Sequence, residues 1–167
     1  FDIPANSIIG NIRNLTIDDV PEVTKLLNEY LNKYIIHQEF TEKDILHWFI
    51  GNDIINSFIV ENDNKITDFC SYYALDSKNL EQKNCFIKTC YLFYYFNNKN
   101  TLKDLVNKML LEAKNHNFDI FNMTNIMDNS SIIDELKFKK GTGKLNYHFY
   151  NWKMPKIDSD KIGFAMI

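Results

Sequence analysis

Cysteine is scarce in this sequence, and its spacing argues against two kinds of stabilised domain. Cys70, Cys85 and Cys90 are odd in number and contain no Cys-x-x-Cys pair, so neither a disulfide framework nor a cysteine zinc site is expected. The four histidines are scattered and lack the spacing of metal ligands. The sequence therefore predicts reduced thiols, no metal and a cytoplasmic protein.

Long apolar runs, a positive net charge and a targeting signal are also missing. No apolar stretch approaches the length needed to cross a membrane, so no integral membrane segment is expected. The formal net charge of −3 at pH 7 argues against a general nucleic-acid surface. The length of 167 residues suits one domain with a real core. Because the chain starts with Phe1 and not Met, we expect a piece of a longer protein, with residues 1–7 as a linker.

Acidic residues are absent from the stretch 136–153, which carries five lysines that we interpret as facing solvent. Gly141 and Gly143 flank Thr142, and two glycines so close together are typical of a turn. The glycines also allow a phosphate-loop interpretation. That loop requires Gly-Lys-Ser/Thr leading into a helix, whereas Lys144 is followed by Leu145 and a strand pattern. A hairpin turn is the favoured interpretation.

A long aromatic strand is predicted directly after this turn, over residues 145–152. Its side chains alternate with a period of two. One face carries Leu145, Tyr147 and Phe149, and the other carries Asn146, His148, Tyr150 and Trp152. Rings on both faces predict a strand that is buried on both sides, or that has one face lining a groove.

The order of elements along the chain predicts a mixed α/β fold. We expect helices that begin at Thr16, Thr41, Thr101 and near Asp128. Strands are expected over 8–15, 56–61, 66–75, 85–96, 118–122, 145–152 and 161–167. The turn-rich tetrad Asn62-Asp63-Asn64-Lys65 is expected to join the second and third of these strands as a hairpin. The sheet should be mostly antiparallel, with one parallel crossover through the helix over 101–116. This order resembles that of an acetyltransferase-type half.

The turn before the helix at Thr101 bears on which substrate this half binds. An acetyl-CoA enzyme of that type normally has a glycine-rich loop at a helix N-terminus, where backbone N–H groups hold the pyrophosphate. Here the helix is preceded by Asn97-Asn98-Lys99-Asn100, which contains no glycine. We therefore expect that this half does not hold the CoA.

Many short motifs, in order and in register, resemble a single family. They are Asp19-Val20-Pro21, Leu26-Leu27, His47-Trp48-Phe49, Val60-Glu61-Asn62, Thr67-Asp68-Phe69 with Ser71 and Tyr73, residues 118–122, Leu136-Lys137-Phe138, and Tyr150-Asn151-Trp152-Lys153. The chain is similar to the eukaryotic glycylpeptide N-myristoyltransferases, specifically to their C-terminal half. The resemblance implies an enzyme of two acetyltransferase-like halves, of which residues 8–167 form the peptide-binding one. The N-terminal half would bind most of the myristoyl-CoA, and this half alone would be inactive.

The resemblance also implies the site residues. The family's catalytic base is the chain's own terminal carboxylate, which here belongs to Ile167. The positions implied for the peptide groove are Tyr73, Ser77, Tyr91, Asn122, Thr142 and Leu145. Each position also has a plain alternative. The tyrosines and the leucine suit core packing, the serine suits a turn, the asparagine suits a strand end, and most chain termini are exposed.

This chain departs from the family pattern in the glycine motif. Lys139 stands where the family has its first glycine, and Thr142 stands where it has an acid that receives a basic side chain of the peptide. Met123 and Thr124 also replace small and apolar residues, which reshapes the pocket. A divergent enzyme is one interpretation. The alternative is a non-catalytic acetyltransferase-like module that kept the peptide groove and lost the chemistry.

Overall fold

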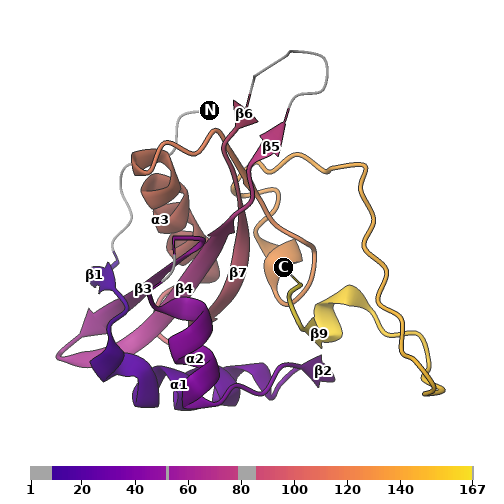
Figure 1. Ribbon diagram of the computed structural model, residues 1–167, viewed down its shortest axis with the longest axis horizontal. Helices are drawn as coiled ribbons and strands as arrows, with labels where there is room; N and C mark the ends of the chain where they lie inside the picture. The colour runs from indigo at the N-terminus through magenta and orange to yellow at the C-terminus, as the bar shows by residue number, and fades with distance from the viewer. Residues whose placement is uncertain (1–8, 52, 79–85, 167) are drawn as a thin grey trace.

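The computed structural model describes residues 9–51, 53–78 and 86–166 of the chain (Figure 1). The linker expected over residues 1–7 lies outside these residues and stays a prediction. The elements follow in the order β1 (Asn11–Asn14), α1 (Val20–Leu31), β2 (Ile36–His37), α2 (Glu42–Phe49), β3 (Ile55–Asn62), β4 (Lys65–Ala74), β5 (Ser77–Lys78), β6 (Phe86–Ile87), β7 (Thr89–Asn97), α3 (Leu102–Asn115), β8 (Ile120–Asn122) and β9 (Ile162–Gly163). Short 3-10 helices cover Ile17–Asp19, Asn129–Ser131 and Ser159–Lys161.

The main sheet has five strands in the order β1-β3-β4-β7-β8. All neighbours are antiparallel except β7 and β8, which are parallel and joined through α3. The predicted mixed α/β class, with one parallel crossover through that helix, is confirmed. The predicted hairpin between β3 and β4 is confirmed too. Asp63 and Asn64 both adopt positive φ angles, of 52° and 58°, as a tight two-residue turn demands.

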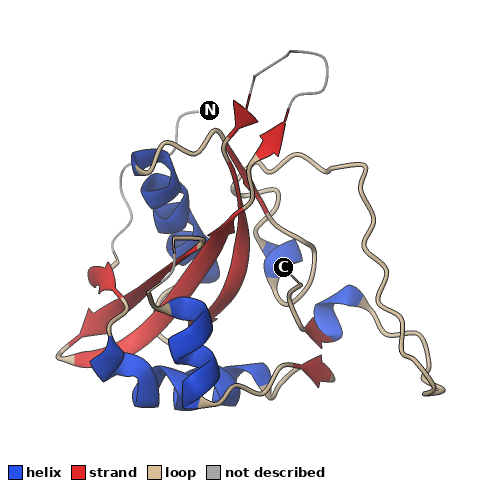
Figure 2. Cartoon of the chain, in the orientation of Figure 1, coloured by secondary structure: helices blue, strands red, loops and turns tan. Residues whose placement is uncertain are grey.

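Helices cover both faces of the sheet (Figure 2). On one face the Tyr72 hydroxyl lies 2.6 Å from Nδ1 of His116, the residue that ends α3. On the other face the ring of Phe49 from α2 packs 5.6 Å from the ring of Phe93 on β7. The helix starts predicted at Thr41 and Thr101 are confirmed, because each threonine hydroxyl accepts the backbone N–H three residues later.

The aromatic strand predicted over 145–152 is wrong. These residues belong to a long connection that runs outside the body of the protein between two 3-10 helices (Figure 1). Among the residues that the structure describes, no backbone group of 139–157 forms a hydrogen bond. Tyr150 and Trp152 are 98% and 67% exposed, respectively. The alternating pattern is present, but no strand lies beside it to pair with, and a strand requires a partner.

Other predicted boundaries also change. The glycine turn at Gly141–Gly143 is not followed by a strand, so the hairpin there is wrong, and no helix follows it directly as a phosphate loop would need. The last strand shortens to β9, and its predicted end at Ile167 lies outside the described residues. The strand over 85–96 divides into β6 and β7. The buried strand over 118–122 shortens to β8, which is only partly buried.

Candidate functional site

The segment after residue 160 lies against the stretch that follows α1, where the backbone N–H of Ile35 donates to the carbonyl of Lys161. Ile162 and Gly163 form β9, which pairs in parallel with β2. The carbonyl of Ile162 also accepts the backbone N–H of Met127 at 3.0 Å. Gly163 packs so closely on Tyr34 that a Cβ placed there would lie 2.5 Å from the ring. Any larger residue at position 163 would therefore force Tyr34 or the strand β9 to move.

Three tyrosine hydroxyls hold the next three residues in turn. Tyr147 donates to the carbonyl oxygen of Phe164 at 2.7 Å. The hydroxyl of Tyr94 accepts the backbone N–H of Ala165 at 3.0 Å and donates to the carbonyl of the same residue at 3.4 Å. Tyr73 donates to the carbonyl of Met166 at 3.3 Å. We call these three hydroxyls the tyrosine clamp.

The clamp residues come from three separate parts of the chain: β4, β7 and the connection 139–157. Burial raises the pKa of each of Tyr73, Tyr94 and Tyr147 above its ordinary value. Each hydroxyl is therefore protonated at neutral pH and able to donate. The three hydroxyls therefore stay able to donate hydrogen bonds over the whole physiological pH range.

Tyr73 also belongs to a row of side chains that crosses the sheet. It lies opposite Tyr91, which in turn lies opposite Asn122 on the neighbouring strand. Directly opposed residues point to the same face of a sheet. The rings of Tyr73 and Tyr91 stack 5.2 Å apart at an interplanar angle of 10°. The structure thus aligns three of the predicted peptide-contact residues in one row, and its first member, Tyr73, contacts the clamped segment.

The other predicted site residues do not join this row. Ser77 lies on the short strand β5 and is exposed. Thr142 and Leu145 lie on the connection 139–157, where the leucine is 51% exposed. Ile167 lies outside the described residues. The roles proposed for all of these residues stay predictions.

Sequence reasoning missed two residues of this site, Tyr94 and Tyr147. Their only sequence signal was their place in aromatic-rich stretches, which is equally typical of core packing. Their hydrogen bonds depend on which distant segment lies against them. Together with Tyr73, they form an apolar and aromatic surface that holds residues 164–166 by their backbone.

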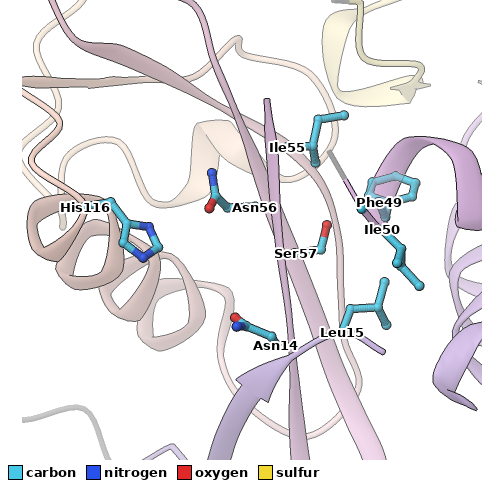
Figure 3. Close-up of a pocket in the computed structure, with 9 residues that line it drawn as sticks. Asn14, Leu15, Phe49, Ile50, Ile55, Asn56, Ser57 and His116 are labelled. Carbon is cyan, nitrogen blue, oxygen red and sulfur yellow. The ribbon is translucent and has the colours of Figure 1, made fainter. Parts of the chain in front are cut away.

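The structure also contains a surface hollow of about 250 Å³ at the outer edge of β3 (Figure 3). Its polar lining comes from Asn14, Asn56, Ser57 and His116. Among the described residues nothing hydrogen-bonds to the buried hydroxyl of Ser57. None of the predicted site residues lines this hollow.

Within the described ranges the protein has neither a metal-binding cluster nor a membrane-spanning helix. No group of three or more His, Cys, Asp or Glu side chains is placed to hold a metal ion there. No described helix is both long enough and apolar enough to span a bilayer. Cys70 and Cys90 are buried free thiols, and burial raises the pKa of Cys90 to about 12. Cys85 lies outside the described residues.

Comparisons with known proteins connect this geometry to a family. Residues 1–164 match the family model described as myristoyl-CoA:protein N-myristoyltransferase, C-terminal domain. The chain is 37% identical over 161 residues to a glycylpeptide N-tetradecanoyltransferase of Plasmodium falciparum, covering 95% of this chain and 39% of that protein. It is 34% identical over 169 residues to glycylpeptide N-tetradecanoyltransferase 2 of Danio rerio, covering 99% and 34%. The chain thus spans between about a third and two fifths of these relatives.

Solved structures agree with the sequence comparison. The crystal structure of Saccharomyces cerevisiae N-myristoyltransferase with bound myristoyl-CoA superposes with a TM-score of 0.76 at 30% identity, covering 84% of this chain and 38% of that one. An acetyltransferase of Clostridium acetobutylicum solved with acetyl-CoA superposes with a TM-score of 0.66 at 14% identity, covering 83% and 95%. The second likeness shows the fold alone, and it confirms the predicted acetyltransferase-like class.

Proposed function

The chain belongs to the myristoyl-CoA:protein N-myristoyltransferase family as its C-terminal domain, and we propose that it supplies the peptide-binding face and the general base of such an enzyme. In this proposal the whole enzyme transfers myristate from myristoyl-CoA to the N-terminal glycine of proteins. The observation that carries the proposal is the segment 164–166, which the tyrosine clamp holds beside Tyr73, Tyr91 and Asn122. The buried thiols of Cys70 and Cys90 fit a reducing cytoplasm.

The chemistry needs a base because the glycine amine is protonated near neutral pH and cannot attack. In the proposed step the Ile167 carboxylate takes one proton from the ammonium group. The amine nitrogen then attacks the thioester carbonyl carbon, the carbon–sulfur bond breaks, and the second amine proton leaves with the sulfur as a thiol. The pKa of a free α-carboxyl lies roughly four units below that of an α-amine, so proton transfer from the ammonium to the carboxylate is unfavourable by about 5–6 kcal/mol. Burial of the reacting groups when the substrate binds would narrow that gap, because burial disfavours both charged forms.

The acyl donor is proposed to bind mainly to the part of the enzyme that this chain does not contain. The turn that leads into α3 supports this. The backbone N–H groups of Lys99 and Asn100 donate to the Asp68 carboxylate at 3.2 and 2.9 Å. Asp68 is fully buried. An internal carboxylate therefore already occupies two backbone amides of the turn before α3, and its charge would repel a pyrophosphate there.

The rest of the enzyme is also the proposed partner of the connection 139–157. Leu145, Phe149, Tyr150 and Trp152 are all exposed there. So much aromatic surface on one segment is typical of an interaction surface. The isolated chain is accordingly proposed to be inactive.

A non-catalytic peptide-binding module is the second candidate. Thr142 and Lys139 favour it, because they replace a groove acid and a glycine of the family pattern. Full-length enzyme that binds glycine-starting peptides but transfers no myristate would support this candidate.

The test of the base adds one alanine after Ile167 in the full-length enzyme. The extension moves the carboxylate by one residue, at most about 3.6 Å. We expect kcat to fall by about 10²- to 10⁴-fold, the usual contribution of a general base, while the peptide Kd changes little. Unchanged turnover would show that the base lies elsewhere. As a control, a lysine added at the same place is removed with a basic carboxypeptidase, which should restore turnover.

A further inference from the structure

The tyrosine clamp contacts backbone atoms of the three residues that precede Ile167. We propose that Tyr94 and Tyr147 are positioning residues, whose hydroxyls fix where the terminal base is presented. The inference rests on the proposed function, because it assumes that the Ile167 carboxylate is the base. Neither tyrosine belongs to the peptide row formed by Tyr73 and Tyr91.

Tyr94 is built as a rigid support. Its ring packs edge-on against Phe40 at 4.9 Å and Phe93 at 4.6 Å, and only 2% of the residue is exposed. The hydroxyl therefore cannot move without the core. It meets both the N–H and the carbonyl of Ala165, at 3.0 and 3.4 Å, so it constrains the position and the direction of that peptide unit.

Tyr147 has a different role because it sits on the exposed connection 139–157. Its bond to the Phe164 carbonyl, at 2.7 Å, is the shortest of the clamp. Within the described chain, it is also the hydrogen bond by which this connection is attached to the rest of the protein. Its ring packs edge-on against Phe164 at 6.3 Å. Tyr147 thus ties the segment that carries Thr142 and Leu145, two predicted peptide contacts, to the segment that carries the base.

Fixing these residues matters because chain ends normally fray. A general base must lie within about 2.6–3.2 Å of the proton it removes, and a displacement of about 1 Å can cost on the order of 10²-fold in rate. Side-chain bonds to consecutive backbone groups remove that freedom before substrate arrives. Loss of one hydroxyl should therefore lower turnover more than it lowers peptide binding.

The experiment compares Tyr94→Phe and Tyr147→Phe with Tyr95→Phe in the full-length enzyme. Tyr95 is the matched control: it neighbours Tyr94 on β7, is fully buried, and hydrogen-bonds to Asn129 and Asp128 rather than to the late segment. We expect Tyr94→Phe and Tyr147→Phe each to lower kcat about tenfold, with the peptide Kd within about twofold of wild type. Tyr95→Phe should lower the unfolding temperature and keep kcat. Equal kcat in Tyr94→Phe and Tyr95→Phe would overturn the inference.

The alanine extension separates this inference from the proposed function. In an enzyme already extended after Ile167 the base is misplaced, so Tyr94→Phe should lower kcat little further. The effects on kcat of residues that act as a unit are not additive. A full additional tenfold loss in that background would contradict the positioning role. Should the extension itself leave turnover unchanged, the base assignment fails. Should the extension abolish turnover while both phenylalanine variants keep wild-type kcat, only the positioning role fails.

Discussion

Replacing Gly163 with alanine is expected to loosen the late segment and reduce activity together. An added Cβ would lie 2.5, 2.9 and 3.0 Å from three side-chain atoms of Tyr34, whereas ordinary carbon contacts are about 3.5–4.0 Å. Either the Tyr34 side chain or the backbone at position 163 must therefore move by about 1 Å. Tyr34 cannot easily yield, because it is only 4% exposed and its hydroxyl donates to Asp128 at 3.0 Å. The strand β9 is the part expected to shift.

Overpacking of this kind typically costs about 1–3 kcal/mol. A domain of about 150–250 residues that unfolds as one unit loses about 2–4 °C in its midpoint per kcal/mol, so Gly163→Ala should lower the unfolding transition of this domain by about 2–12 °C. The assay is thermal unfolding of the full-length enzyme, followed by kcat for myristoyl transfer at a temperature where both proteins are folded. Gly141→Ala is the matched control, because nothing lies within 4 Å of a Cβ built there. A midpoint within 1 °C of wild type, with unchanged kcat, would refute the steric argument.

Two further predictions concern buried charge. Hydrogen bonds led by that from Arg13 lower the pKa of Asp19 to about 2, so the stability gained from ionising Asp19 is present above about pH 4 and lost between about pH 4 and 2. Arg13→Met should therefore lower the free energy of unfolding by about 1–2 kcal/mol at pH 7 and by much less at pH 2, as measured by urea unfolding. An equal loss at both pH values would contradict this. Asp68→Asn should lower the free energy of unfolding by about 2–3 kcal/mol, because a side-chain amide replaces the carboxylate that accepts the N–H groups of Lys99 and Asn100. Hydrogen exchange at these two backbone amides should become faster. Unchanged exchange there would contradict the prediction.

Local sequence signals located most of the framework. The capping pattern of Thr41 with Asp44 marked the start of α2, and Asp63-Asn64 marked the hairpin turn between β3 and β4. These signals work because the forces are local. A cap satisfies amides one turn away, and a tight turn depends on the backbone angles of its own two residues.

The late part of the chain could not be predicted in the same way. Alternation over 145–152 says which side chains share a face, but pairing depends on a partner strand that no local pattern specifies. The clamp posed the same difficulty. Tyr94 reads as one aromatic residue among many in β7, and its function is decided by Ala165, which is far away in sequence and close in space. Tyr73, Tyr91 and Asn122 were identified through family resemblance and not by their chemistry.

The pairing of β2 with β9 has a consequence for how the protein assembles. One strand follows the first helix and the other follows every other described element, so their contact closes a loop that contains α2, α3 and the strands β3 to β8. Closing so long a loop costs entropy that only the already packed sheet and helices can offset. We therefore expect β9 to dock last during folding. Nascent chains should acquire their core first and the clamped segment only after synthesis of the whole domain, which makes that segment the last part of the domain to become native.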